Sequence, residues 1–405
     1  MKEQKIGKER RYDIDWLRVM AILAVFFFHC AQFFRSGAWI LKNAEHSLVA
    51  DVFSGWLAFW GMPLFFLLSG SGSWYALRSI SSGQYLLERA KRLLVPFYTV
   101  GVFLLLPISA YFWAIHHLGY PGTSTFWEML IHYFGHWEFT LESPHGLMPV
   151  PFHGHLWFLQ YLFLISLLTL PLMHYLRSER GFHLIDTLAR WCRRRAGVFL
   201  FLIPVLLVRI SLKSIPFSGL YTWADFLEFV VFFIIGYILA ADTRFAQSIQ
   251  KHSWICLISG LVSFAVVVYF ALEFGYFGGG PFSSTFVLYQ TVWSIGRWSW
   301  IVFVLNIGAK YLNSDNRVLA CSSEAVLPFY ILHEPMIVWV GWFVIHWNIG
   351  ILPKYLIIAV ASFVLIMTLY ELFVRRFNAV RFFFGMRPRK RRFASPAHPP
   401  EGTAA

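Results

Sequence analysis

Long apolar runs separated by short polar segments make up most of this chain. About ten of these runs reach the 17 to 25 residues that a helix needs to cross a bilayer. We therefore predict an all-α, polytopic membrane bundle of about ten transmembrane helices. The runs lie at about 16–34, 52–76, 93–115, 155–176, 197–213, 224–241, 254–274, 286–309, 325–345 and 354–374.

Ionisable residues interrupt the first run, RYDIDWLRVMAILAVFFFHCAQFF, at positions where a membrane helix normally has none. At about 100° per residue, Arg18 and His29 project from nearly the same face, and Asp15 falls within about 40° of His29. His29 lies roughly 16 Å further along the helix than Arg18, within a hydrocarbon core about 30 Å thick. Because burial at that depth is costly, His29 marks a reaction site or pathway, or else hydrogen-bonds a neighbouring helix.

The second run contains the small residues Gly70, Ser71, Gly72 and Ser73. Small side chains let two helix backbones approach each other closely in a membrane. We therefore expect another helix to pack tightly at this position.

The composition is that of a membrane protein and argues against a nucleic-acid-binding protein. The 405 residues are 58% hydrophobic and 14% charged, as in integral membrane proteins. The net charge of +13 would suit nucleic-acid binding, but the basic residues occur in short blocks between apolar runs, where they act as topology signals. We therefore exclude a nucleic-acid partner. The cysteines are scattered and predict neither a disulfide framework nor a zinc site: Cys30, Cys192, Cys256 and Cys321.

The basic blocks predict that both termini are cytoplasmic. They include the first eleven residues, the loop around Arg89 and Arg92, and the run from Arg190 to Arg195. Arg209 and Lys213, at the outer end of the fifth run, go against the charge rule. We divide the chain into a transmembrane domain, 1–386, and a basic, disordered cytoplasmic tail, 387–405.

Residues 116–153 differ from the other connections, because they contain glutamates and histidines but no Lys or Arg. We expect an extracytoplasmic loop that includes a short amphipathic helix. Glu128, His132 and His136 are spaced four apart, which invites a metal interpretation. An interfacial helix rich in Trp and His explains the pattern equally well, so we predict no metal site.

Further charged residues lie within the later apolar runs. Arg297 is near the centre of its run and must find an anion or line a cavity, and Glu228 is a candidate partner. Glu371 and Arg375 stand at i and i+4, which favours a structural ion pair.

Seven motifs, taken in order, resemble the membrane-bound acyltransferase 3 family, and within it the glucan biosynthesis protein C-like branch. The resemblance extends from about Tyr12 to Met386. The motifs are YDIDWLRVMAILAVFFFH, MPLFFLLSG, ERAKRLLVPF, HGHLWFLQYL, ADFLEFVVFFIIGYILAAD, AVLPFYILHEPMIV and YELFVRRFNAVRFFFGM.

This resemblance implies an enzyme of the bacterial inner membrane. It would transfer a short acyl group, acetyl or succinyl, from cytoplasmic acyl-CoA to a hydroxyl of an extracytoplasmic glycan. Acyl-CoA would be a co-substrate, and no tightly bound cofactor is expected. Arg18 and His29 match the family's Arg-to-His motif, Arg89 and Arg92 match its basic pair, and His333 matches its Pro-Phe-Tyr-x-Leu-His run. Glu334 stands where Gln is more often expected.

The residues fit this chemistry. Acyl transfer needs a base for the hydroxyl proton, and imidazole exchanges protons near neutral pH. We assign His29 as base, with transient acyl acceptor as the alternative, and include Arg18 and Asp15 in the catalytic set. Arg18, Arg89 and Arg92 would hold the phosphates of acyl-CoA, although topology alone could explain the last two. The predicted substrate-binding residues are His155, Trp157, Arg297, His333 and Glu334.

A secondary transporter is the main alternative, because it would also have about ten helices and a few buried charges. Transporters of this kind show paired broken helices or an inverted repeat, and the sequence contains no evident example of either. A membrane scaffold would not explain why Arg18 and His29 share a helix face.

Overall fold

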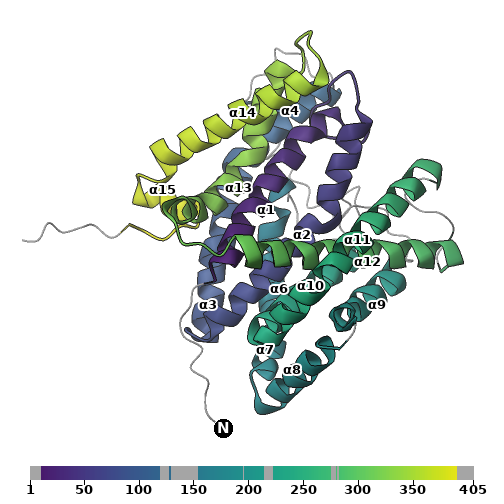
Figure 1. Ribbon diagram of the computed structural model, residues 1–405. Coiled ribbons are helices and arrows are strands. Elements are labelled where there is room, and N and C mark those ends of the chain that lie inside the picture. The colour runs from purple at the N-terminus through teal and green to yellow at the C-terminus, as the bar shows by residue number, and fades with distance from the viewer. Residues whose placement is uncertain are drawn as a thin grey trace, which may run out of the picture.

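The computed structural model describes residues 11–118, 127–128, 154–194, 196–213, 222–274, 280 and 282–389, and within them every regular element is helical (Figure 1). The α-helices are α1 (Tyr12–Ala31), α2 (Leu48–Leu77), α3 (Ser82–Arg89), α4 (Leu106–Leu118), α6 (Trp157–Leu168), α7 (Leu170–Leu176), α8 (Glu179–Cys192), α9 (Leu202–Leu212), α10 (Trp223–Ala241), α11 (Thr243–Phe274), α12 (Ser284–Tyr311), α13 (Arg317–Val344), α14 (Ile351–Leu369) and α15 (Asn378–Phe383). Short 3-10 segments are η1 (Gln32–Phe34), η4 (Gly154–Leu156) and η5 (Gly197–Phe201), and π-helical segments are η2 (Ala90–Leu94), η3 (Phe97–Leu105) and η6 (Tyr370–Val374).

The prediction of an all-α membrane bundle is confirmed. In the described residues, seven helices are long and apolar enough to cross a membrane, and the number rises to eight if α6 and α7, which bend by 51°, cross as one span. Each of the ten predicted runs is helical, but Gly197–Leu212 is short for a span and α12 is not among the apolar spans. The count of ten and the cytoplasmic location of the termini stay predictions.

Two predicted segments lie largely outside the described residues. They are most of the 116–153 loop, which includes His132 and His136, and the tail from residue 390 onward.

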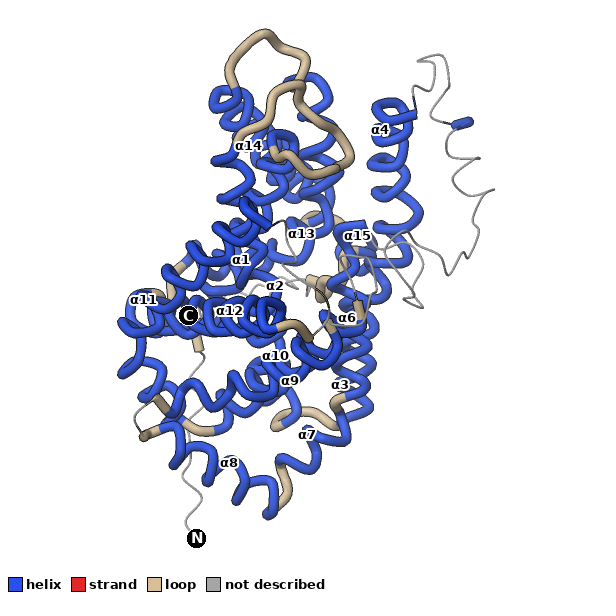
Figure 2. Tube along the Cα trace, turned by 90° about the vertical axis from the view of Figure 1, so that its right-hand side faces the viewer, coloured by secondary structure: helices blue, strands red, loops and turns tan. Residues whose placement is uncertain are grey.

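Helix α1 lies at the centre of the upper part of the molecule, where α2, α13 and α14 surround it (Figures 1 and 2). Phe26 of α1 packs edge-on against Phe329 of α13, 5.4 Å away, and Phe363 of α14, 6.2 Å away. In Figure 1, α12 runs across the direction of α1 and α2. The residues of α1 are therefore in contact with several helices that are distant in sequence.

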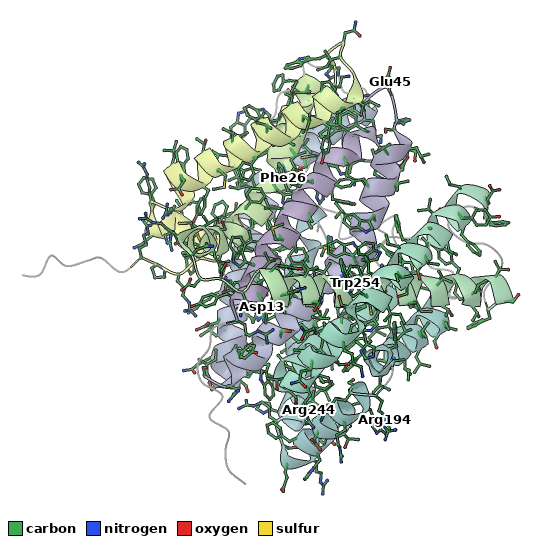
Figure 3. The ribbon with its side chains drawn as sticks, in the orientation of Figure 1. Asp13, Phe26, Glu45, Arg194, Arg244 and Trp254 are labelled. Carbon is green, nitrogen blue, oxygen red and sulfur yellow. The ribbon has the colours of Figure 1, made fainter. Side chains whose placement is uncertain are left out.

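Three labelled residues mark the two ends of the molecule. Figure 3 shows Arg194 and Arg244 at the lower end and Glu45 at the upper end. Trp254 is 75% exposed on α11, as expected of a side chain that faces lipid.

The small residues of α2 pack against α10, as predicted. A Cβ added at Gly70 would lie 1.9 Å from the carbonyl oxygen of Phe233, and one added at Gly236 would lie 1.9 Å from that of Leu67. Ser71 Oγ donates a 2.9 Å hydrogen bond to the carbonyl oxygen of Gly236. The two helix backbones therefore touch, and no larger side chain fits between them.

We expect Gly236→Val to destabilise the folded protein by about 1–3 kcal/mol, because the added side chain forces α2 and α10 apart. Thermal denaturation of the purified protein in detergent, followed by size-exclusion chromatography, measures the effect. The control is Gly61→Val on α2, where no atom lies within 4 Å of an added Cβ. Equal melting temperatures for the two variants would contradict close packing at Gly236.

Candidate functional site

Three histidines and one glutamate meet between α1, η4 and α13. His29 Nε2 lies 3.3 Å from one carboxylate oxygen of Glu334, and His155 Nδ1 lies 3.3 Å from the other. His333 Nε2 lies 3.2 Å from His29 Nδ1. We call these four residues the histidine cluster. Its side chains are buried except for that of His29, which is 14% exposed.

The local sequence explains how His155 reaches the cluster. Pro335 has no amide N–H, so the carbonyl oxygen of Ile331, four residues earlier on α13, loses its helical partner. His155 Nε2 lies 3.1 Å from that oxygen, and the Tyr330 hydroxyl donates to the backbone carbonyl of His155. Gly154 has a φ of 37°, a left-handed conformation that glycine adopts readily. These features hold His155 Nδ1 against Glu334.

The hydrogen-bond network assigns the protons on the histidine rings. His333 Nδ1 lies 2.5 Å from the carbonyl oxygen of Tyr330 and must donate, so its Nε2 is an acceptor. His29 Nδ1 faces this acceptor and the carbonyl oxygen of Val25 at 2.9 Å, so it also carries a proton. His29 Nε2 is then left to exchange a proton beside Glu334.

His155 is arranged in the same way, because its Nε2 donates to a carbonyl oxygen and its Nδ1 faces Glu334. The carboxylate therefore faces two imidazole nitrogens, each of which has a lone pair when its ring is neutral. At least one proton must lie between the three groups to avoid repulsion. His29, Glu334 and His155 can thus accept and release a proton together.

Three arginines form a second group, the arginine cluster, nearer the start of α1. Arg18 Nη1 lies 3.2 Å from Asp15 Oδ1, and Arg18 Nη2 donates to the carbonyl oxygen of Leu68 at 3.1 Å. Arg89 Nη2 donates to Ser73 Oγ at 2.8 Å. Arg18 interacts electrostatically with both Arg89 and Arg92. The structure therefore brings together all three arginines that the sequence predicts to bind acyl-CoA.

The two clusters occupy the predicted polar face of α1, about 16 Å apart along the helix. Asp15 belongs to the arginine cluster, where it pairs with Arg18. The sequence places Asp15 on the same face of α1 as His29. In the structure, however, Asp15 contacts Arg18 near the start of the helix and is not part of the histidine cluster.

Two predicted substrate-binding residues lie elsewhere. Trp157 is 7% exposed and packs 5.5 Å from the ring of Phe229 and 5.1 Å from that of Tyr161. Arg297 is 7% exposed and pairs with Glu228 at 2.7 Å, which confirms the predicted partnership. Contact of either side chain with substrate stays a prediction.

Two other predictions can be compared with the structure. Glu371 and Arg375 form the expected ion pair, with 2.7 Å between their charged atoms. In the described part of the chain, no group of three or more His, Cys, Asp or Glu residues is arranged to hold a metal ion. The candidate ligands His132 and His136 lie outside that part.

Sequence reasoning did not predict that Trp39, which follows the first span, lies beside His29 of the histidine cluster. Its ring centroid lies 6.4 Å from that of His29 and 4.6 Å from that of Phe33. A single tryptophan in a loop carries no periodic signal. The free carbonyl of Ile331, which orients His155, could have been predicted from the sequence, because Pro335 stands four residues after it.

Comparisons with known proteins agree with the resemblance noted from the motifs. The family model described as "Acyltransferase domain" matches residues 11–371, which include both clusters. "Glucans biosynthesis protein C" of Escherichia coli strain SMS-3-5 / SECEC is 21% identical over 350 residues, which cover 83% of this chain and 84% of that protein. The protein of the same name from strain K12 / DH10B is 20% identical with the same coverage. No solved structure matches the chain.

Proposed function

The chain belongs to the acyltransferase domain family, and from this premise we propose that it is a membrane-bound, acyl-CoA-dependent O-acyltransferase. It transfers a short acyl group, acetyl or succinyl, from cytoplasmic acyl-CoA to a hydroxyl of an extracytoplasmic glycan. The observation that carries this proposal is the 3.3 Å contact between His29 Nε2 and the Glu334 carboxylate. His29 stands on α1, the helix that also bears Arg18. The relatives' name, which refers to glucans, supports a polysaccharide acceptor.

The histidine cluster supplies the base. His29 Nε2 takes the proton of the acceptor hydroxyl while the hydroxyl oxygen attacks the thioester carbonyl carbon. The proton then lies beside Glu334, so the new imidazolium charge is neutralised where it forms. The carbon–sulfur bond breaks as the tetrahedral intermediate collapses, and the CoA thiolate leaves.

The position of Glu334 favours a base over a transient acyl acceptor. An acyl group on Nε2 would replace the proton that interacts with the carboxylate, and it would need space where Glu334 Oε2 lies 3.3 Å away. Proton uptake needs only a hydroxyl oxygen within hydrogen-bond distance of Nε2, which takes less space than a bonded acyl group and leaves the new N–H beside the carboxylate. Direct transfer from the thioester to the hydroxyl is therefore the simpler route.

The arginine cluster binds the donor. Guanidinium groups form paired hydrogen bonds with phosphate oxygens, and CoA presents several phosphates. Bonds to Asp15 and to the carbonyl oxygen of Leu68 hold Arg18 in place, and Ser73 does the same for Arg89. The thiol-bearing arm of acyl-CoA extends along the polar face of α1 toward His29, about 16 Å away.

The acceptor approaches from the opposite end. Trp39 and His155 lie beside His29 on the side of η1 and η4, where a sugar ring could stack on the indole. In the bacterial inner membrane, with the start of α1 in the cytoplasm, this side faces outward. A transporter lacks comparable support, because the matching family is one of acyltransferases.

We expect His29→Ala to lower the turnover number for acyl transfer by about 10²–10⁴-fold, because it removes the base. The assay uses purified protein in proteoliposomes with radiolabelled acetyl-CoA or succinyl-CoA and envelope glycans as acceptors. His346→Ala is the control, since His346 is exposed just after α13 and its ring hydrogen-bonds only the carbonyl oxygen of Trp342 on that helix. Wild-type turnover by His29→Ala would refute the assigned base. Absence of acyl-CoA binding and turnover by folded wild-type protein would refute the proposed function.

We expect Arg89→Gln to weaken acyl-CoA binding by about tenfold or more, because it removes a charged phosphate ligand. Isothermal titration with a non-hydrolysable acyl-CoA analogue measures the dissociation constant. Arg190→Gln removes an exposed arginine from α8 and should leave it unchanged. If Arg89 serves topology alone, both variants will bind the analogue as the wild type does.

A further inference from the structure

A second group of buried charges lies between α9, α10 and α12, and it shares no residue with the histidine cluster. Glu228 is fully buried, and its two carboxylate oxygens accept hydrogen bonds from Arg209 Nη1 at 2.8 Å and from Arg297 Nη1 at 2.7 Å. Arg209 is 4% exposed and Arg297 is 7% exposed. One carboxylate therefore bridges two guanidinium groups.

The charges in this region do not cancel. Lys213 and Asp225 form a neighbouring ion pair at 2.8 Å and interact electrostatically with the arginines. Three positive groups, Arg209, Lys213 and Arg297, thus face two negative groups, Asp225 and Glu228. The adjoining segments 214–221 and 275–281 contain no Asp or Glu. Among the described residues of this region, one positive charge remains in excess, which is costly inside a membrane protein unless an anion joins it.

The same region contains hydrogen-bond donors that lack acceptors. Gln290 Oε1 accepts from Arg209 Nε at 2.8 Å, but Gln290 Nε2 and Trp293 Nε1 are buried without a partner among the described residues. Unpartnered buried donors are uncommon and indicate a missing ligand or water. Here both orphan groups are donors, as an anion requires.

The donors converge because of their positions on α12. Gln290, Trp293 and Arg297 stand at i, i+3 and i+7, on one face of the helix. The guanidinium carbons of Arg209 and Arg297 lie 5.2 Å and 5.1 Å from the Trp293 ring centroid. The Nη2 groups of both arginines make no hydrogen bond to a described residue and are not among the enclosed unpartnered atoms. They remain available to a ligand.

We propose that this site binds a phosphate group with a single negative charge, such as the phosphodiester of an anionic phospholipid. Its oxygens would accept hydrogen bonds from the two arginines, Gln290 and Trp293, because guanidinium and amide donors match its several acceptors. Its charge would balance the excess positive charge. Glu228 stands five residues after Trp223, the first residue of α10, or about 8 Å along the helix, so the site is near enough to a membrane surface for a headgroup.

The test is native mass spectrometry of the full chain in detergent, in a buffer that contains no phosphate. The protein is titrated with phosphatidylglycerol, with uncharged diacylglycerol, and with inorganic phosphate as competitor. We expect phosphatidylglycerol to bind at least about tenfold more tightly than diacylglycerol, and Arg209→Gln to abolish this difference. Arg190→Gln, at an exposed position on α8, is the control for loss of one positive charge and should bind as the wild type does.

Glu228→Gln provides the second variant, which keeps the proposal testable if Arg209→Gln does not fold. It raises the excess to two positive charges and removes the competing carboxylate, so phosphatidylglycerol should bind more tightly. A network that serves stability alone predicts no such gain. Binding of inorganic phosphate that excludes the lipid would support the phosphate site and identify free phosphate as its ligand. Equal binding of both lipids by the wild type, with no phosphate bound, would overturn the proposal.

Discussion

The carboxylate of Glu334, placed between two imidazoles, is the group on which the geometry of the histidine cluster depends. It lies 3.3 Å from His29 and 3.3 Å from His155, and it thereby joins α1, η4 and α13. An isolated carboxylate at this depth would be expensive, and so would an isolated imidazolium. Together, the carboxylate and the imidazoles can share a proton at this depth. Pro335 makes the arrangement possible, because it frees the Ile331 carbonyl that orients His155.

Helix α1 connects this proton site with the arginine cluster. Arg18 and His29 share one face, so in the proposed reaction a donor held by its phosphates at one end would extend toward the proposed base at the other. The tight contact of α2 with α10 keeps Leu68 and Ser73, which hold Arg18 and Arg89, at a fixed position. The positive charge of the arginine cluster is thus held in place at one end of α1, and the intervening part of the helix lies among packed helices.

Much of this could be predicted from periodicity and the cost of buried charge. The shared face of Arg18 and His29, the close approach at Gly70, and the Glu228–Arg297 pair all follow from local spacing or from the need to neutralise a charge. The meeting of His155 with Glu334 could not be predicted, because the two residues lie far apart in sequence and only the fold brings them together. Arg209 opposes the charge rule because it pairs with Glu228 inside the protein. The polar face of α12 likewise contacts protein, so its hydropathy does not indicate a span.

The central claim is that His29 and Glu334 act as one proton-exchanging unit in acyl transfer. A double-mutant cycle tests it, with His29→Ala, Glu334→Gln and the double variant compared with the wild type for acyl transfer from radiolabelled acyl-CoA in proteoliposomes. The account predicts that the double variant loses about as much activity as the more damaged single variant, because the second change removes nothing that still works. Losses that multiply, as for two independent groups, would contradict it.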